Sequence, residues 1–179
     1  MELLLANIPF ILVLVLLIIR VISAVKNGAV KEICSLISAV VSSVFVLLIA
    51  FAIREYFHEA RIIFVITIIL LVLLLVVYKI LQLALTTMKI IAKLPVVGFI
   101  NKLLGIVIGA VEVVFVVCAV FSLVKVMDLG AIERWMMNCK DANPIMEQIY
   151  NLNETTVYPV VASIGDRLRR LDLFGKLGM

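Results

Sequence analysis

The chain has 179 residues, of which 65% are hydrophobic and only 16% are charged, with a net charge of +4 and a mean hydropathy of +1.29. Soluble domains are typically about 45–50% apolar and about 25% charged, so this composition excludes a soluble enzyme and predicts an integral membrane protein. Its basic residues flank apolar runs, which favours anionic lipid headgroups, and not nucleic acid, as their partner.

The first apolar run covers Leu3–Ile19 and is long enough to cross a bilayer as a helix. Because no lysine or arginine precedes it, we expect a retained helix and not a cleaved signal peptide. A connector is predicted over Arg20–Glu32, since Asn27-Gly28 is a strong turn signal. The second span is predicted over Ile33–Ile53. Its small residues indicate either close helix packing or serines bonded to their own backbone carbonyls; they are Ser35, Ser38, Ala39, Ser42 and Ser43.

The third span is predicted from Ile62 to Tyr78, after a short charged loop in which His58 is interpreted as a solvated side chain and not a metal ligand. The helix is expected to continue beyond the span until Pro95 ends it. Polar residues recur there at spacings of three and four, which predicts a basic face on the headgroups or a helix end whose lysines reach the interface. These residues are Lys79, Gln82, Thr86, Lys89 and Lys93.

The fourth span is predicted from Ile100 or Leu103 to Val124. We therefore expect an all-α membrane protein, with a bundle of about four transmembrane helices in residues 1–125. Residues 126–179 are predicted to form a polar tail of two or three amphipathic helices, lying on the membrane or on the bundle. The three cysteines are interpreted as small apolar residues, and neither a metal site nor a cofactor is expected.

The most specific motif opens the fourth span. Gly105 and Gly109 are four residues apart in an apolar run, so they share a helix face that permits close backbone contact, and Asn101 extends that face by one turn. The triplet Gly28-Ala29-Val30 recurs as Gly109-Ala110-Val111. The placement of the two triplets suggests a two-fold internal repeat of parallel halves.

With these two motifs the sequence resembles the colicin V production protein family of bacterial membrane proteins. The resemblance rests on two groups, Gly28, Lys31 and Glu32 before the second span, and Asn101, Lys102, Gly105 and Gly109 at the last one. It covers about residues 1–125, and the tail adds nothing to it. Asn27 and Ile108 stand where the family commonly has a basic residue. The resemblance implies about four spans, a cytoplasmic-membrane location and a link to toxin production or export, but no settled biochemical activity.

Glu112 is the one acidic residue well inside a predicted span, where an unpaired carboxylate costs several kcal/mol. It is predicted either to serve a polar or proton-linked site or to bond across helices as packing, with Lys26, Lys31 or Lys102 as candidate partners. Glu32 and Lys31 are expected mainly at the interface, and Asn101 is expected to cap the fourth helix. The basic interface face is predicted to comprise Lys79, Lys89, Lys93 and Lys102.

The first and third connectors hold more lysine and arginine than the opposite side, which favours both termini outside the cytoplasm.

The leading hypothesis is a small transporter, channel or export accessory whose polar route is lined by Glu112 and the Gly105/Gly109 face. The alternative is a membrane scaffold that recruits partners through its tail and basic connectors. Neither is an enzyme, since no nucleophile–base set is visible. Four helices are few for an autonomous pore, so we expect a homo-oligomer or a membrane partner.

Overall fold

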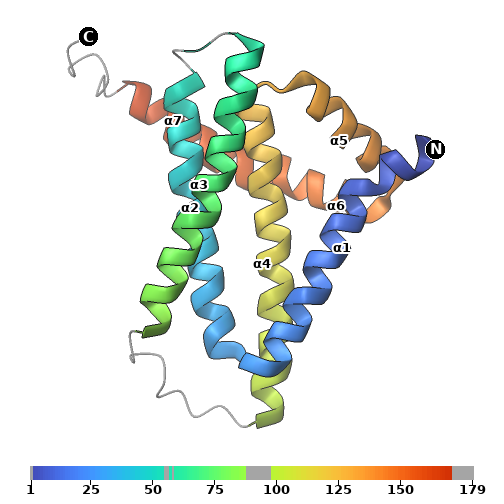
Figure 1. Ribbon diagram of the computed structural model, residues 1–179, viewed down its shortest axis with the longest axis vertical. Coiled ribbons are helices and arrows are strands. Elements are labelled where there is room, and N and C mark those ends of the chain that lie inside the picture. Colours follow the sequence, from blue (N-terminus) through green and yellow to red (C-terminus); the bar gives the residue numbers. More distant parts are fainter. Residues whose placement is uncertain (1, 55–56, 58, 88–97, 171–179) are drawn as a thin grey trace.

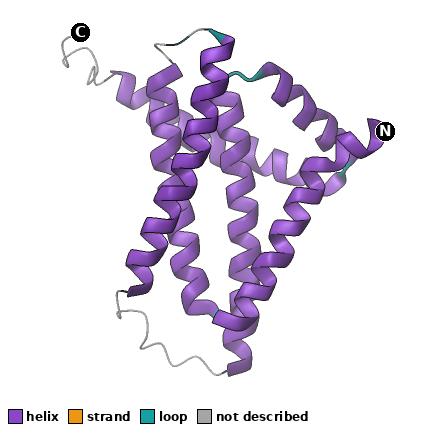
Figure 2. Ribbon diagram, in the orientation of Figure 1, coloured by secondary structure: helices purple, strands orange, loops and turns teal. Residues whose placement is uncertain are grey.

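The computed structural model describes residues 2–54, 57, 59–87 and 98–170, and the regular elements within them are all helices (Figure 2). Four are long and apolar enough to cross a membrane. They are α1 (Glu2–Asn27), α2 (Ala29–Arg54), α3 (Ala60–Thr87) and α4 (Gly98–Val126). The predicted all-α membrane fold is therefore confirmed.

The central pair of the bundle is α2 and α4, with α1 packed against α4 and α3 packed against α2 (Figure 1). In the most apolar stretch of each helix, 39% of α2 and 33% of α4 are buried, compared with 6% of α1 and 17% of α3. The outer helices expose large apolar side chains such as Ile19 and Ile69. Such a surface is suited to lipid and not to water.

The prediction of a connector over Arg20–Glu32 is wrong, because the turn between α1 and α2 is much shorter. A single residue, Gly28, separates the two helices. Gly28 has φ +76° and its N–H donates to the Ala24 carbonyl at 2.8 Å, which ends α1 in the left-handed conformation that favours glycine. Arg20 therefore lies inside α1, and Glu32 lies inside the first turns of α2.

The tail folds into α5 (Gly130–Ala142), α6 (Pro144–Leu152) and α7 (Tyr158–Arg170). Asn143 separates α5 from α6 and caps α6, because its Oδ1 accepts from the backbone N–H groups of Ile145 and Met146. One π-helical turn, Asn153–Val157, joins α6 to α7, so the backbone stays helical through Tyr158-Pro159.

The tail helices pack on the end of the bundle away from Gly28, α5 against α1 and α7 against α2 (Figure 1). Met146 and Ile149 join the same apolar core as Val46 of α2, and the Ser122 hydroxyl of α4 donates to Asn153 Oδ1 at 2.8 Å. All three cysteines are buried free thiols, and burial raises the pKa of Cys139 in α5. Of the two predicted positions for the tail, the structure shows the one on the bundle.

Candidate functional site

Arg20 of α1 is the centre of a polar cluster inside the bundle. Its Nη1 donates to Glu32 Oε2 at 3.5 Å and its Nη2 donates to Ser35 Oγ at 2.6 Å, both on α2. The same guanidinium also contacts the Tyr78 hydroxyl of α3 and pairs with the Glu112 carboxylate of α4. These five residues, here called the Arg20 cluster, connect all four long helices.

Burial makes these contacts energetically important. Glu32 and Glu112 are each 1% exposed, Ser35 is fully buried and the Arg20 side chain is 19% exposed. A charge held away from water is costly unless it is paired and hydrogen-bonded. The cluster meets part of this demand, because the Ser35 and Tyr78 hydroxyls donate to Glu112 Oε1, each at 3.1 Å.

The charges within the cluster do not balance. One guanidinium serves two carboxylates, and among the described residues Glu112 Oε2 has no hydrogen-bond partner. Glu32 has additional support from the Ser23 hydroxyl, which donates to its Oε1 at 3.1 Å. If both carboxylates are ionised, one negative charge is left over. The arrangement is therefore suited to taking up a proton or another cationic group at Glu112.

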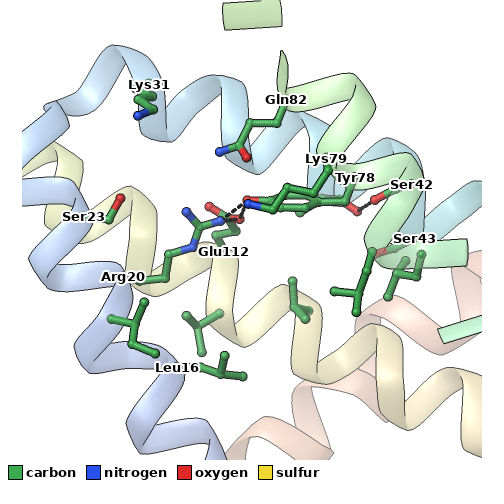
Figure 3. Close-up of a pocket in the computed structure, with 16 residues that line it drawn as sticks. Leu16, Arg20, Ser23, Lys31, Ser42, Ser43, Tyr78, Lys79, Gln82 and Glu112 are labelled. Carbon is green, nitrogen blue, oxygen red and sulfur yellow. Dashed lines mark hydrogen bonds and ion pairs between the residues drawn. The ribbon is translucent and has the colours of Figure 1, made fainter. Parts of the chain in front are cut away.

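Three members of the cluster, Arg20, Tyr78 and Glu112, line a cavity of about 460 Å³. In Figure 3, Tyr78, Lys79 and Gln82 extend from α3 toward Arg20 and Glu112. Ser42 and Ser43 of α2 line the same cavity, and among the described residues Ser43 Oγ has no hydrogen-bond partner. Apolar atoms form most of the lining surface, although nine of the sixteen lining residues have polar side chains. The cavity therefore combines convergent polar groups with apolar walls, as small-molecule sites do.

The two motif glycines of α4 bring these groups together. A Cβ on Gly105 would lie 3.1 Å from the backbone of both Gly28 and Ala29, so α4 touches the α1–α2 turn here. One turn further along, Gly109 lies beside Arg20 and Glu32, with its Cβ position 3.7 Å from Arg20 Cβ. The predicted small-residue face is therefore the surface on which the ends of α1 and α2 pack.

Asn101 does not cap its own helix, contrary to prediction. Its Oδ1 accepts from the Ala29 backbone N–H at 2.8 Å, so this α4 side chain caps the N-terminus of α2. The same side chain fills the space beside Gly28, whose Cβ position would lie 2.9 Å from Asn101 Cγ. Gly28, Asn101 and Gly105 are thus parts of one interlock between α4 and the α1–α2 turn.

Asn101→Ala is expected to lower the free energy of unfolding by about 1 kcal/mol, since loss of a capping side chain typically costs 0.5–2 kcal/mol. The physical reason is that the Ala29 N–H loses its acceptor in a tightly packed turn. Titration of the purified protein with a denaturing detergent measures the change, with Lys102→Ala at the exposed neighbouring position as the control. Equal stability of the two variants would contradict the cap.

The structure places the other predicted site residues unevenly. Glu112 is buried as expected, but its cationic partner is Arg20 and not Lys26, Lys31 or Lys102. Glu32, expected mainly at the interface, is buried in the cluster. Lys31 is exposed, donates to Asn27 Oδ1 at 3.1 Å and lines the cavity.

Arg20, Ser35 and Tyr78 were not predicted as site residues. The sequence did contain one signal that the first helix continues past Arg20. Residues 21–25 after Arg20 are again mostly apolar, which is not expected if the span ended at Arg20. With the helix extended to Asn27, Arg20 becomes an intramembrane charge that requires a partner.

Of the predicted basic interface face, Lys79 and Lys102 are exposed. Lys89 and Lys93 lie outside the described residues, as does His58. The two Gly-Ala-Val triplets are not at equivalent points, since Gly28 is the turn residue before α2 whereas Gly109 lies in the interior of α4. Within the described part of the chain, no group of three or more His, Cys, Asp or Glu side chains could hold a metal ion.

Comparison with known proteins gives one family. The family model described as "Colicin V production protein" matches residues 11–163. The match extends through α5 and α6 into α7, so the expectation that the tail adds nothing to the resemblance is wrong. Comparison with curated proteins and with solved structures gives no match.

Proposed function

We propose that this chain, which belongs to the Colicin V production protein family, serves toxin production as a small membrane transporter, channel or export accessory. The observation that carries the proposal is the Arg20 cluster on the wall of the cavity. Ionisable groups within a membrane are costly, and those that persist commonly mark a pathway for protons, ions or substrates. The cluster has one more carboxylate than it has guanidinium groups. Glu112 would therefore be the group that takes up a proton when the cavity opens to a different side of the membrane.

The surroundings of the chain are part of the proposal. The end of the bundle that holds the Gly28 turn carries Lys26, Lys31, Lys79 and Lys102, and the opposite ends of the long helices carry Arg54, Arg61 and Lys125. This small excess of positive charge would, by the positive-inside tendency, place the Gly28 end on the cytoplasmic side of a bacterial cytoplasmic membrane. Both termini would then lie on the opposite side. The exposed apolar faces of α1 and α3 suit lipid, a second copy of the chain or a membrane partner, and no enzymatic step is proposed.

A membrane scaffold is the second candidate. The tail helices expose apolar side chains on the end of the bundle, Ile145 at 52% and Val160 at 56%. A partner protein could bind this surface with no participation of the Arg20 cluster. The two candidates therefore differ in which residues toxin production depends on.

The test replaces the three charges of the cluster by uncharged side chains of similar size, as R20M/E32Q/E112Q. In cells that produce a colicin-type toxin through this chain, we expect loss of released toxin with normal amounts of the variant in the membrane. The milder Tyr78→Phe, which removes one hydroxyl from the cluster, is expected to reduce release.

The matched control is R54M/D128N, which removes the charges of the Arg54–Asp128 pair (3.1 Å) at the surface of the bundle and keeps at position 128 a residue that tolerates the observed φ of +54°. Toxin release should be unchanged in this variant. Normal release from both R20M/E32Q/E112Q and Tyr78→Phe would overturn the transport proposal and leave the scaffold.

A further inference from the structure

The cavity is a groove between α1 and α3, and its floor is formed by α2 and α4. Across it, α1 and α3 meet through the contact between Arg20 and the Tyr78 hydroxyl. Since both outer helices expose apolar side chains to the membrane, a groove between them is accessible to lipid. Its walls carry the apolar side chains of Leu16, Ile19, Leu74 and Leu75, and its floor carries those of Val113 and Val116.

Two exposed lysines supply positive charge to this groove. Lys31 of α2 and Lys79 of α3 both line it, and Lys79 Nζ lies 5.5 Å from the centre of the Tyr78 ring. Lys31 lies in the first turn of α2, next to Gly28. Lys79 lies eight residues before the end of α3 at Thr87, on the part of α3 that extends toward the same end of the bundle (Figure 1). Positive charge next to an apolar groove matches an anionic headgroup joined to a hydrocarbon chain.

Two buried polar atoms also indicate that the groove holds a further molecule. Ser43 is 2% exposed and Glu112 is 1% exposed, yet Ser43 Oγ and Glu112 Oε2 have no hydrogen-bond partner among the described residues. Buried polar atoms in folded proteins are nearly always paired, with protein, with water or with a ligand. Both residues line the groove. A lipid ester carbonyl would accept a hydrogen bond from the Ser43 hydroxyl, and a water molecule carried with the lipid would donate one to Glu112 Oε2.

We propose that the groove binds one anionic phospholipid, with its phosphate at Lys31 and Lys79 and one acyl chain between α1 and α3. This inference rests on the proposed function in one respect: it assigns a ligand to the same cavity. The volume of about 460 Å³ lies within the range of small-molecule sites and admits a part of the lipid, while the remainder stays in the bilayer. Bound in this way, the lipid covers the exposed side of the Arg20 cluster.

Photocrosslinking tests the location. The wild-type protein is reconstituted in nanodiscs with phosphatidylglycerol that carries a diazirine on one acyl chain, and crosslinked peptides are identified by mass spectrometry. We expect crosslinks concentrated on residues 16–23 of α1 and 74–82 of α3. We expect few crosslinks with phosphatidylcholine that carries the same diazirine-labelled acyl chain. Crosslinks spread evenly over the outer faces of α1 and α3, around Ile11 or Ile69, would overturn the groove site.

Charge reversal tests the headgroup contact. K31E/K79E is expected to weaken phosphatidylglycerol binding, measured by native mass spectrometry of the purified protein, about tenfold or more. The control K26E/K102E makes the same charge change at exposed lysines of α1 and α4 that do not line the groove, and it should bind nearly as the wild type. Equal losses in the two variants would show surface attraction only and overturn the proposal.

Two further outcomes separate the possible ligands and the two proposals. Displacement of the lipid by millimolar inorganic phosphate would mean an anion site without a bound acyl chain, and it would overturn the lipid assignment. Binding is measured without toxin, so the two proposals can fail separately. Lost toxin release from R20M/E32Q/E112Q with retained groove crosslinks supports both proposals, whereas normal release from this variant and from Tyr78→Phe overturns the proposed function alone.

Discussion

Arg20→Leu is expected to lower the free energy of unfolding by about 3–5 kcal/mol, the typical cost of removing one partner from a buried ion pair. The change leaves two carboxylates, Glu32 and Glu112, that are each 1% exposed and without their cation. It also removes the donor that connects α1 to Ser35 and Tyr78. We therefore expect a large loss of folded protein, measured as the midpoint of unfolding by a denaturing detergent in mixed micelles.

The neutral triple variant R20M/E32Q/E112Q distinguishes lost pairing from lost volume. It removes all three charges but keeps side chains of similar size, and its amides can still bond to Ser23, Ser35 and Tyr78. We expect it to recover most of the stability that Arg20→Leu loses, because replacing a buried ion network by well-packed neutral groups is often close to neutral.

The stability control is Arg54→Leu at the surface pair with Asp128, where the expected change is at most about 1 kcal/mol. An Arg20→Leu variant as stable as Arg54→Leu would contradict the buried pair. A triple variant as unstable as Arg20→Leu would show that the loss comes from the packing of the arginine and its bonds to Ser35 and Tyr78, and not from unpaired carboxylates.

Gly105→Leu is expected to prevent the packing of α4 against the α1–α2 turn, so that little folded protein is recovered. A Cβ at Gly105 already lies 3.1 Å from the backbone nitrogen of Ala29 and 3.3 Å from the Ala24 carbonyl oxygen. Backbone atoms of a helix turn cannot rotate away as a flexible side chain can. The helices must separate, and Asn101 then loses its contact with the N-terminus of α2.

The matched pair Gly105→Ala and Gly109→Ala isolates this effect, because the same methyl group is added four residues apart on one helix face. At Gly109 the nearest atom would be Glu32 Oε2 at 3.6 Å, an ordinary contact. We expect Gly105→Ala to destabilise by about 1–3 kcal/mol. Gly109→Ala should be neutral or stabilising by up to about 1 kcal/mol, since alanine is the better helix former. The same detergent titration measures both, and equal effects would contradict the interlock.

The sequence predicted the number of long helices and their class well, since an uninterrupted apolar run longer than a bilayer is thick has few alternatives to a spanning helix. It also selected Gly28, Asn101, Gly105, Gly109 and Glu112 by local rules for turns, small-residue faces and intramembrane charge. Three of these, Gly28, Asn101 and Gly105, form the interlock between α4 and the α1–α2 turn. Gly109 lies beside Arg20 and Glu32, and Glu112 lies in the Arg20 cluster. Whether they serve transport stays a prediction.

The end of the first helix could not be obtained from the same rules. Arg20 resembles the charged end of a span, and Asn27-Gly28 resembles the middle of a longer connector. In the structure the helix continues to Asn27, because Arg20 finds a partner inside the bundle and is not required to reach water. Local hydropathy contains no information about such a partner.

By itself, the sequence determined that this is a multi-pass helical membrane protein with a glycine face on its last span, because burial in lipid restricts both length and composition. Only the tertiary structure decided which charges meet. Arg20 and Glu112 are 92 residues apart, and Asn101 and Ala29 are 72 apart, so each pairing depends on how whole helices pack. That packing is set by the close approach of Gly105 to the Gly28 turn, which fixes the register of α4 against α1 and α2 and places the carboxylate beside the guanidinium.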